Sequence, residues 1–182
     1  MRISEALSKK GHDVKIITGV TREPQEDFEV YTKRTGVPVK VIGELRREIN
    51  PLSDLIALWK LYISIKKEKP DIVHTHTSKA GIVGRWAARL NRIKTIIHST
   101  HGHVFYGYFC KLKTVFFLSV ERLTARITYR ITTLTNLEIE DYKKLGLANQ
   151  EKFIALPYGI DTEDFRRSEV ARDKLRSALG IS

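Results

Sequence analysis

The sequence predicts an α/β fold: a Rossmann-like, mostly parallel sheet with helices on both faces. Short runs of valine and isoleucine alternate with longer stretches whose apolar residues recur every third or fourth position, which is typical of successive βα units. The chain has 182 residues, of which 42% are hydrophobic and 29% charged. This composition suits one packed domain and excludes a disordered chain. The single cysteine, Cys110, excludes an internal disulfide and a cysteine-based zinc site.

The chain opens on the end of a helix rather than on a strand. Ile3, Ala6 and Leu7 form one apolar stripe, and the run Lys9-Lys10-Gly11 is a typical helix stop. Because a doubly wound sheet normally begins with a strand, we expect this sheet to lack its first strand.

Six short β-branched runs are expected to form strands, over residues 13–18, 37–42, 71–75, 94–98, 131–134 and 152–156. The clearest helix follows Asn50, an N-cap candidate, and Pro51, a proline at the first helical position, and it should end in the lysine-rich turn before Pro70. Further helices are expected over residues 78–90, 111–129, 136–145 and 169–179.

Positive charge is concentrated in one part of the chain. The 32 lysines and arginines exceed the 21 acidic residues and give a formal net charge of +11. Between residues 79 and 130 there are ten basic residues and a single acidic one, Glu121. Such a field favours an anionic partner, which is a nucleic acid, an anionic membrane surface or a phosphorylated ligand; a merely solvated basic face is the alternative.

Five of the six histidines lie between residues 74 and 103, at positions 74, 76, 98, 101 and 103. His74 and His76 share one face of a predicted strand, and His101 and His103 flank Gly102 just beyond another, so both pairs should lie at the carboxyl ends of the sheet, where open α/β sheets bind ligands. A polar substrate site is favoured over a structural role and over a metal site, since no carboxylate or HExxH motif accompanies the histidines.

Residues 76–81 (HTSKAG) place hydroxyl groups and a lysine at a strand-to-helix turn, where free N–H groups suit an anion or a sugar hydroxyl. The GxGxxG, P-loop and GxSxG motifs are absent from the sequence, so a dinucleotide cofactor has no support. Residues 104–120 interleave aromatic residues with lysines, which suits either a membrane interface or a core helix entered by an aromatic loop. No stretch reaches the roughly 18 apolar residues of a membrane-spanning helix.

Four segments, in order, resemble the N-terminal half of the family-four retaining glycosyltransferases: residues 10–14 (KGHDV), residues 69–76 (KPDIVHTH), the turn Thr100-His101-Gly102, and residues 157–161 (PYGID) ahead of Phe165. The run HTSKAG, with Gly84-Arg85 and Glu121-Arg122-Leu123, is similar to bacterial members that extend capsular, exopolysaccharide or lipopolysaccharide repeat units. Tyr158 departs from the family pattern, because it stands where asparagine is usual.

The resemblance implies the GT-B fold, in which two Rossmann-like domains face each other across a cleft. Residues 1–165 would be the acceptor-side domain, and residues 166–182 would begin the crossing into a C-terminal nucleotide-sugar domain. The implied reaction transfers a sugar from a nucleotide sugar to a glycan or polyprenyl-diphosphate-linked acceptor, with retention of configuration and without a metal or other cofactor. The 182-residue chain by itself is expected to be inactive, because most of the nucleotide-sugar site belongs to the second domain.

The same resemblance implies a cytoplasmic protein, peripheral on the anionic inner face of the plasma membrane. No nucleic-acid partner is expected, because no RNA-binding motif accompanies the aromatic and basic residues. It assigns His101 as the catalytic-site residue, which binds and orients the transferred sugar rather than acting as a base. The other residues are implied to bind substrate (His76, Ser78, Lys79, Gly102 and His103) or to shape the interdomain crossing (Gly159 and Asp161). The alternatives are a non-hydrolysing nucleotide-sugar 2-epimerase and a non-catalytic basic binding module.

Overall fold

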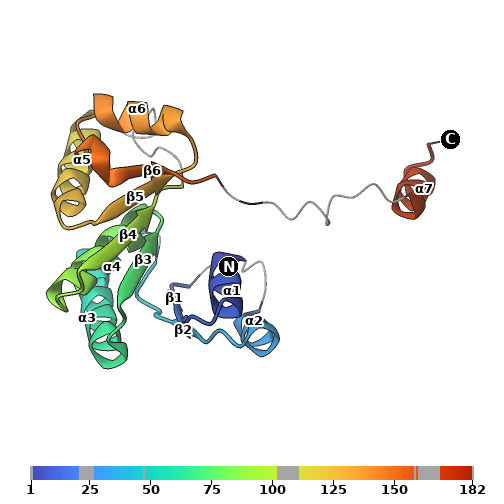
Figure 1. Cartoon of the computed structure of the whole chain (residues 1–182), viewed down its shortest axis with the longest axis horizontal. Coiled ribbons are helices and arrows are strands. Elements are labelled where there is room, and N and C mark those ends of the chain that lie inside the picture. Colours follow the sequence, from blue (N-terminus) through green and yellow to red (C-terminus); the bar gives the residue numbers. More distant parts are fainter. Residues whose placement is uncertain are drawn as a thin grey trace.

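The computed structural model describes residues 2–20, 27–46, 48–101, 111–157, 159 and 169–181 (Figure 1). Helices and strands alternate along most of the chain, as the hydrophobic pattern predicts. Their order is α1 (Arg2–Lys9), β1 (Ile16–Thr18), α2 (Phe28–Thr35), β2 (Val39–Val41), α3 (Pro51–Glu68), β3 (Ile72–His76), α4 (Ser78–Leu90), β4 (Thr95–Ser99), α5 (Lys111–Arg126), β5 (Arg130–Thr133), α6 (Asn136–Lys144), the 3-10 turn η1 (Gln150–Lys152), β6 (Phe153–Ala155) and α7 (Glu169–Ala178).

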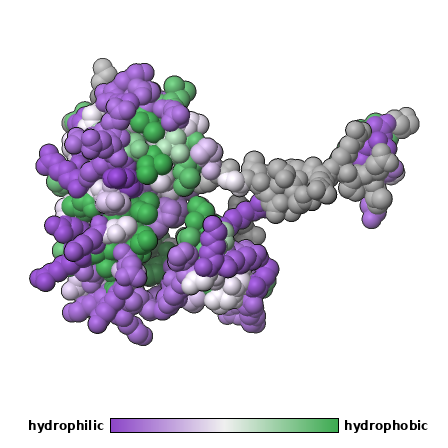
Figure 2. Space-filling model, in the orientation of Figure 1, coloured by the Kyte–Doolittle hydropathy of each residue, from purple (hydrophilic) through white to green (hydrophobic). Residues whose placement is uncertain are grey.

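The strands form two parallel sheets. One has the order β3-β4-β5-β6, and the other pairs β1 with β2. The prediction of a parallel α/β fold is therefore confirmed. Among the described residues, β1 and β3 are each paired on one side only, so the sheet is split between them. Hydrophobic residues gather on the visible face between the part that carries α5 and α6 and the part that carries α1 and α2 (Figure 2).

Helices α1 and α2 lie on the same face of β1 and β2, because Glu5 of α1 binds Arg34 of α2 at 3.2 Å. Ile3 and Leu7 of α1 are 40% and 39% exposed, so the apolar stripe of this helix is only partly covered.

Helix α3 packs against both sheets. Its buried face presents Ala57, Leu61 and Ile65 to a core that includes Ile96 of β4, and Ile17 of β1 packs against the same cluster. A second core joins α5 and α6 to β5 and β6, where the Tyr142 and Phe153 rings stack at 5.7 Å. These two cores fix the four-stranded sheet against its helices.

Most element boundaries follow the sequence signals. The side chain of Asn50 caps α3 by accepting from the Ser53 N–H at 3.1 Å, and Lys69 ends the helix in the left-handed region at φ 47°. Helix α5 ends at Arg126, three residues before the predicted end, because the Tyr129 N–H donates instead to the Ile96 carbonyl of β4. The first two predicted strands are shorter than expected.

Helix α2 was not predicted from the sequence, although the residues that cap its two ends are typical capping residues. The Asp27 carboxylate accepts from the Glu29 and Val30 N–H groups, and Gly36 closes the helix at φ 74°. The helix is only eight residues long and buries Tyr31 alone, so its apolar period was too short to recognise.

A buried ion pair clamps α4 to α5. Arg85 is fully buried, and its Nη2 donates to Glu121 Oε1 at 2.7 Å. Its Nε donates to the Gly81 carbonyl at 3.0 Å and its Nη1 to Thr128 Oγ1 at 3.3 Å, so each of the three guanidinium nitrogens has a partner within the protein. One of the ten bases of the 79–130 segment is therefore structural and does not face a partner.

No helix in the part of the chain that the structure describes is long and apolar enough to cross a bilayer.

Removing the charge of Glu121 should destabilise the fold strongly. Glu121→Gln leaves the Arg85 charge buried and unpaired, and we expect the free energy of unfolding to fall by about 3–5 kcal/mol. Replacing both residues by methionine should recover most of this loss, because no charge then stays buried. Urea denaturation measures both effects. The control is Glu140→Gln, since Glu140 makes an exposed pair with Lys143; equal losses in the two variants would contradict the clamp.

Candidate functional site

Three of the histidines meet at the carboxyl ends of β3 and β4. The rings of His74 and His76, two residues apart on β3, lie with centroids 4.3 Å apart. His101 follows β4, and its Nε2 lies 3.1 Å from His76 Nδ1. The structure thus brings His76 and His101 together, as the sequence predicts. Gly102 and His103 lie outside the described residues.

His98 belongs to the interior instead of the rim. It is 3% exposed, and its Nδ1 lies 3.0 Å from Thr75 Oγ1. A Cβ on Gly81 of α4 would come within 2.5 Å of His98 Cε1. Side chains alternate along a strand, so Thr75 and His98 face α4 while His74 and His76 face the opposite side of the sheet. The histidine cluster of the sequence therefore divides into a buried residue and a rim group.

A row of hydroxyl groups continues the rim group across the sheet. His74 Nε2 lies 2.7 Å from Ser99 Oγ, which in turn lies 2.7 Å from Thr132 Oγ1 of β5. The polar side chains therefore run from β3 through β4 to β5 on one face. Sequence reasoning missed Ser99 and Thr132, because their alignment with His74 depends on the register between strands.

The rim histidines are neutral at physiological pH. Burial, and after it the positive charges that His74 and His101 would carry, lowers the pKa of His76 to about 4. Burial also lowers the pKa of His74 and of His101. A neutral imidazole donates one hydrogen bond and accepts another, so this group suits the hydroxyls of a sugar better than the charge of a phosphate.

The turn between β3 and α4 is strained. Thr77 has φ 63° and ψ 163°, a conformation that β-branched residues rarely adopt, and its side chain makes no cap at the start of α4. Ser78 is exposed at this helix terminus. Strained backbone of this kind clusters at functional sites.

Lys79 is turned toward α3. Its Nζ pairs with the Asp54 carboxylate and also donates to the Glu48 carbonyl. Its charge is thereby compensated, and it links the start of α4 to the region where α3 begins.

The interdomain positions are only partly visible. Gly159 is described and exposed, whereas Tyr158 and Asp161 lie outside the described residues.

Among the residues that the structure describes, no group of three or more His, Cys, Asp or Glu side chains could hold a metal ion.

Comparisons with known proteins relate this chain to glycosyltransferases. The sequence profile of Glycosyltransferase Family 4 matches residues 1–164. An Escherichia coli protein, UDP-Gal:alpha-D-GlcNAc-diphosphoundecaprenol alpha-1,3-galactosyltransferase, is 36% identical over 140 residues, which are 77% of this chain and 36% of that protein. The capsular polysaccharide biosynthesis glycosyltransferase CapM of Staphylococcus aureus is 35% identical over 99 residues, 54% of this chain and 24% of that protein.

The fold is similar to that of a solved bacterial protein. Anabaena Alr3699/HepE, in complex with UDP and glucose, superposes with a TM-score of 0.69 at 17% identity, over 92% of this chain and 50% of that chain. The chain thus spans about a third of the length of the Escherichia coli relative and half that of the Anabaena protein. The similarity confirms the expected GT-B type of fold for this domain.

Acidification should destabilise the chain through His98. Burial, and after it the positive charge of Arg85, lowers the pKa of His98 from 6.5 to about 2, so between these values the unfolded chain binds a proton that the folded chain does not. His98 therefore leaves the free energy of unfolding unchanged above pH 6.5 and lowers it progressively as the pH drops below this value. At about pH 5 the loss is about 2 kcal/mol. Urea midpoints measured across this pH range should depend less on pH in His98→Gln than in the original chain. His12→Gln, which changes an exposed histidine, should keep the original pH dependence. The same pH dependence in both variants would contradict the role of His98.

A methyl group at Gly81 should disturb the packing of α4. Gly81→Ala places a Cβ 2.5 Å from His98 Cε1, and we expect a loss of about 1–3 kcal/mol from overpacking despite the better helix propensity of alanine. Gly43→Ala is the matched control, because a Cβ at Gly43 meets nothing within 4 Å. Thermal unfolding of both variants measures the difference. If the two substitutions lower the unfolding temperature equally, the contact between residue 81 and His98 does not cause the loss of stability.

Proposed function

This chain belongs to glycosyltransferase family 4, and from that premise we propose that it forms the acceptor-side domain of an enzyme that transfers a sugar from a nucleotide sugar to a lipid-linked acceptor. The observation that carries the proposal is the rim group of three neutral histidines, His74, His76 and His101, at the carboxyl ends of β3 and β4. This is where parallel α/β sheets bind ligands, and the hydrogen-bonding capacity of the group suits sugar hydroxyls.

The substrate class is supported by the Escherichia coli relative. Its name specifies a UDP-sugar donor and an acceptor sugar on diphosphoundecaprenol. We propose the same chemical classes for this protein: a nucleoside diphosphate sugar and a polyprenyl-diphosphate-linked glycan. The nucleotide would be held mainly by a second domain, and transfer would proceed with retention at the anomeric carbon. Both relatives are named as transferases, which favours this function over a 2-epimerase.

His101 and His76 would position the transferred sugar rather than exchange protons with it. Because its pKa is about 4, His76 is a weak base at neutral pH. It is suited to hold the His101 ring through the 3.1 Å contact between Nδ1 and Nε2. His101 would then be oriented toward a sugar hydroxyl. Gly102, His103 and Ser78 are proposed to complete this rim, with Gly159 and Asp161 at the crossing between domains.

A lipid-linked acceptor would bring the protein to a membrane. We propose that it works as a peripheral protein on the cytoplasmic leaflet, and its net charge of +11 supports attraction to anionic lipid. Exposed bases of the 79–130 segment contribute to this charge, among them Arg89, Arg92, Lys94, Arg122 and Arg126.

Removing the His101 imidazole should impair transfer with little effect on folding. In a protein that carries both domains, we expect His101→Ala to lower kcat/KM for transfer from UDP-sugar to a polyprenyl-diphosphate-linked acceptor about 100-fold, as the loss of an oriented hydrogen-bond donor does. Radiolabelled sugar extracted with the lipid product is the measurement. His12→Ala, at the exposed histidine before β1, is the control. Full activity of His101→Ala would show that His101 does not take part in the transfer.

A further inference from the structure

Helix α3 is apolar on two opposite faces. Ala57, Leu61 and Ile65 are buried against the core. The opposite face carries large apolar side chains that are exposed to solvent. We call these residues the outer stripe: Leu52 (70% exposed), Leu55 (63%), Ile56 (38%), Trp59 (62%) and Ile63 (44%). At 100° per residue they lie along one side of the helix, and a contiguous exposed apolar surface of this kind marks a docking site.

A hollow of about 310 Å³ lies beside the outer stripe, between α3 and β2. Val41 and Ile42 line it from the β2 side, and Trp59 and Ile63 line it from α3. Two lysines, Lys40 and Lys60, also line it. Lys60 is paired with Glu44 and Lys40 donates to Ser64 Oγ, so the hollow combines apolar side chains with ammonium groups that already have partners.

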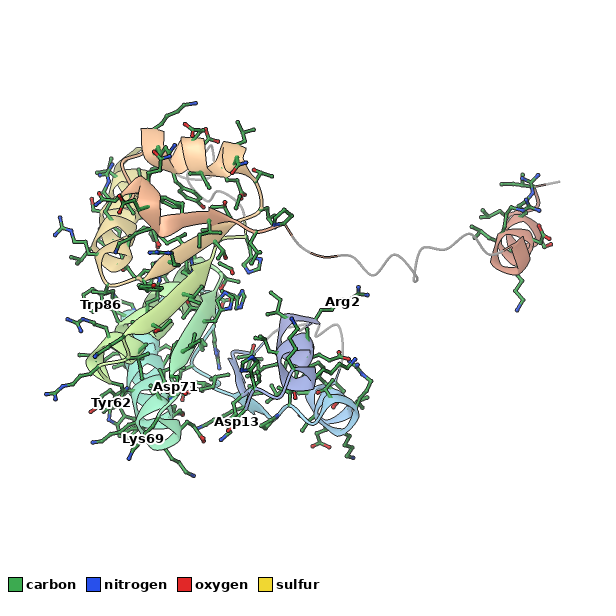
Figure 3. All side chains as sticks on the ribbon, in the orientation of Figure 1. Arg2, Asp13, Tyr62, Lys69, Asp71 and Trp86 are labelled. Atoms are coloured by element: carbon green, nitrogen blue, oxygen red, sulfur yellow. The ribbon has the colours of Figure 1, made fainter. Side chains whose placement is uncertain are left out.

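Further positive charge lies at the C-terminal end of the stripe. Lys66, Lys67 and Lys69 are exposed there, and Lys66 lies 5.8 Å from the centroid of the Tyr62 ring. Figure 3 shows Tyr62 and Lys69 at this end of α3. The neighbouring carboxylate of Glu68 is paired with Lys15. An apolar stripe that contains a tryptophan and ends in lysines matches the surface of an anionic bilayer, in which rings lie at headgroup level and lysines meet lipid phosphates.

We propose that the outer stripe of α3 is the surface by which this chain docks on anionic membranes. A second copy of the chain is a poorer occupant, because the carboxylates of Glu44 and Glu68 beside its own stripe are already paired with Lys60 and Lys15, whereas lipid phosphates can meet Lys66, Lys67 and Lys69 directly. The proposal deepens the proposed function, since a polyprenyl-linked acceptor lies at such a surface, and it locates membrane contact on α3 rather than on residues 104–120.

The two tryptophans allow a direct test on the 182-residue chain. Trp59 belongs to the outer stripe, whereas Trp86 lies on α4 and donates its indole N–H to Thr124 Oγ1 at 3.1 Å. Trp86→Phe leaves Trp59 as the reporter, and Trp59→Phe leaves Trp86. With vesicles that mix phosphatidylglycerol and brominated phosphatidylcholine, we expect a blue shift and strong quenching of Trp59, and little change of Trp86.

Charge substitution tests the same surface without a change of reporter. Leu52→Glu should lower the partition coefficient for phosphatidylglycerol vesicles about tenfold or more in co-sedimentation, since one large apolar side chain no longer enters the interface. Leu137→Glu is the matched control: Leu137 is 72% exposed on α6, and the substitution makes the same change of charge. Circular dichroism confirms that both variants are folded.

Equal quenching of the two tryptophans, equal binding to pure phosphatidylcholine, or equal losses in the two glutamate variants would overturn the proposal. A vesicle-independent blue shift of Trp59 that rises with protein concentration would also overturn it, in favour of pairing between copies. None of these readouts requires donor, acceptor or catalysis, so failure of the docking surface is distinguishable from failure of the proposed transferase activity.

Discussion

The close packing of α4 on β3 and β4 is the constraint on which the site depends. Two glycines make it possible, because a Cβ on Gly81 would meet His98 and a Cβ on Gly84 would lie 3.0 Å from Thr75. With Thr75 and His98 covered by α4, the alternate residues His74, His76 and Ser99 are presented on the other face of the sheet. The Arg85–Glu121 clamp then fixes α4 against α5. The polar rim is thus a consequence of how tightly one helix approaches two strands.

Much of the fold was predictable, because its elements follow local signals. Asn50 and Pro51 fixed the start of α3, and the β-branched runs located all six strands. Three features depended on contacts between distant residues and were not readable: the early end of α5, where Tyr129 bonds to Ile96; the burial of Arg85; and the exposure of Trp59 on α3. Periodicity shows that a helix has an apolar face but does not show what covers it.

The candidate site was predictable in residue type and only partly in arrangement. The spacing of His74 and His76, and the place of His101 after the next strand, indicated that they would meet at the rim, and the structure brings them together. The sequence did not separate His98 from them, because only the strand register and the Gly81 contact decide which histidine is buried. It also did not indicate that Lys79 pairs with Asp54, a residue 25 positions earlier on α3.

The split between β1 and β3 has a consequence for cooperativity. A continuous sheet transmits an opening event from strand to strand through its backbone ladder, but here the β1-β2 ladder ends before β3 begins. The smaller sheet is attached through side chains, such as Ile17 on the α3 cluster and the Lys15–Glu68 pair. We therefore expect the smaller sheet to be a separate foldon, in which the amide protons of β1 and β2 exchange with solvent through local openings that leave the ladder from β3 to β6 intact.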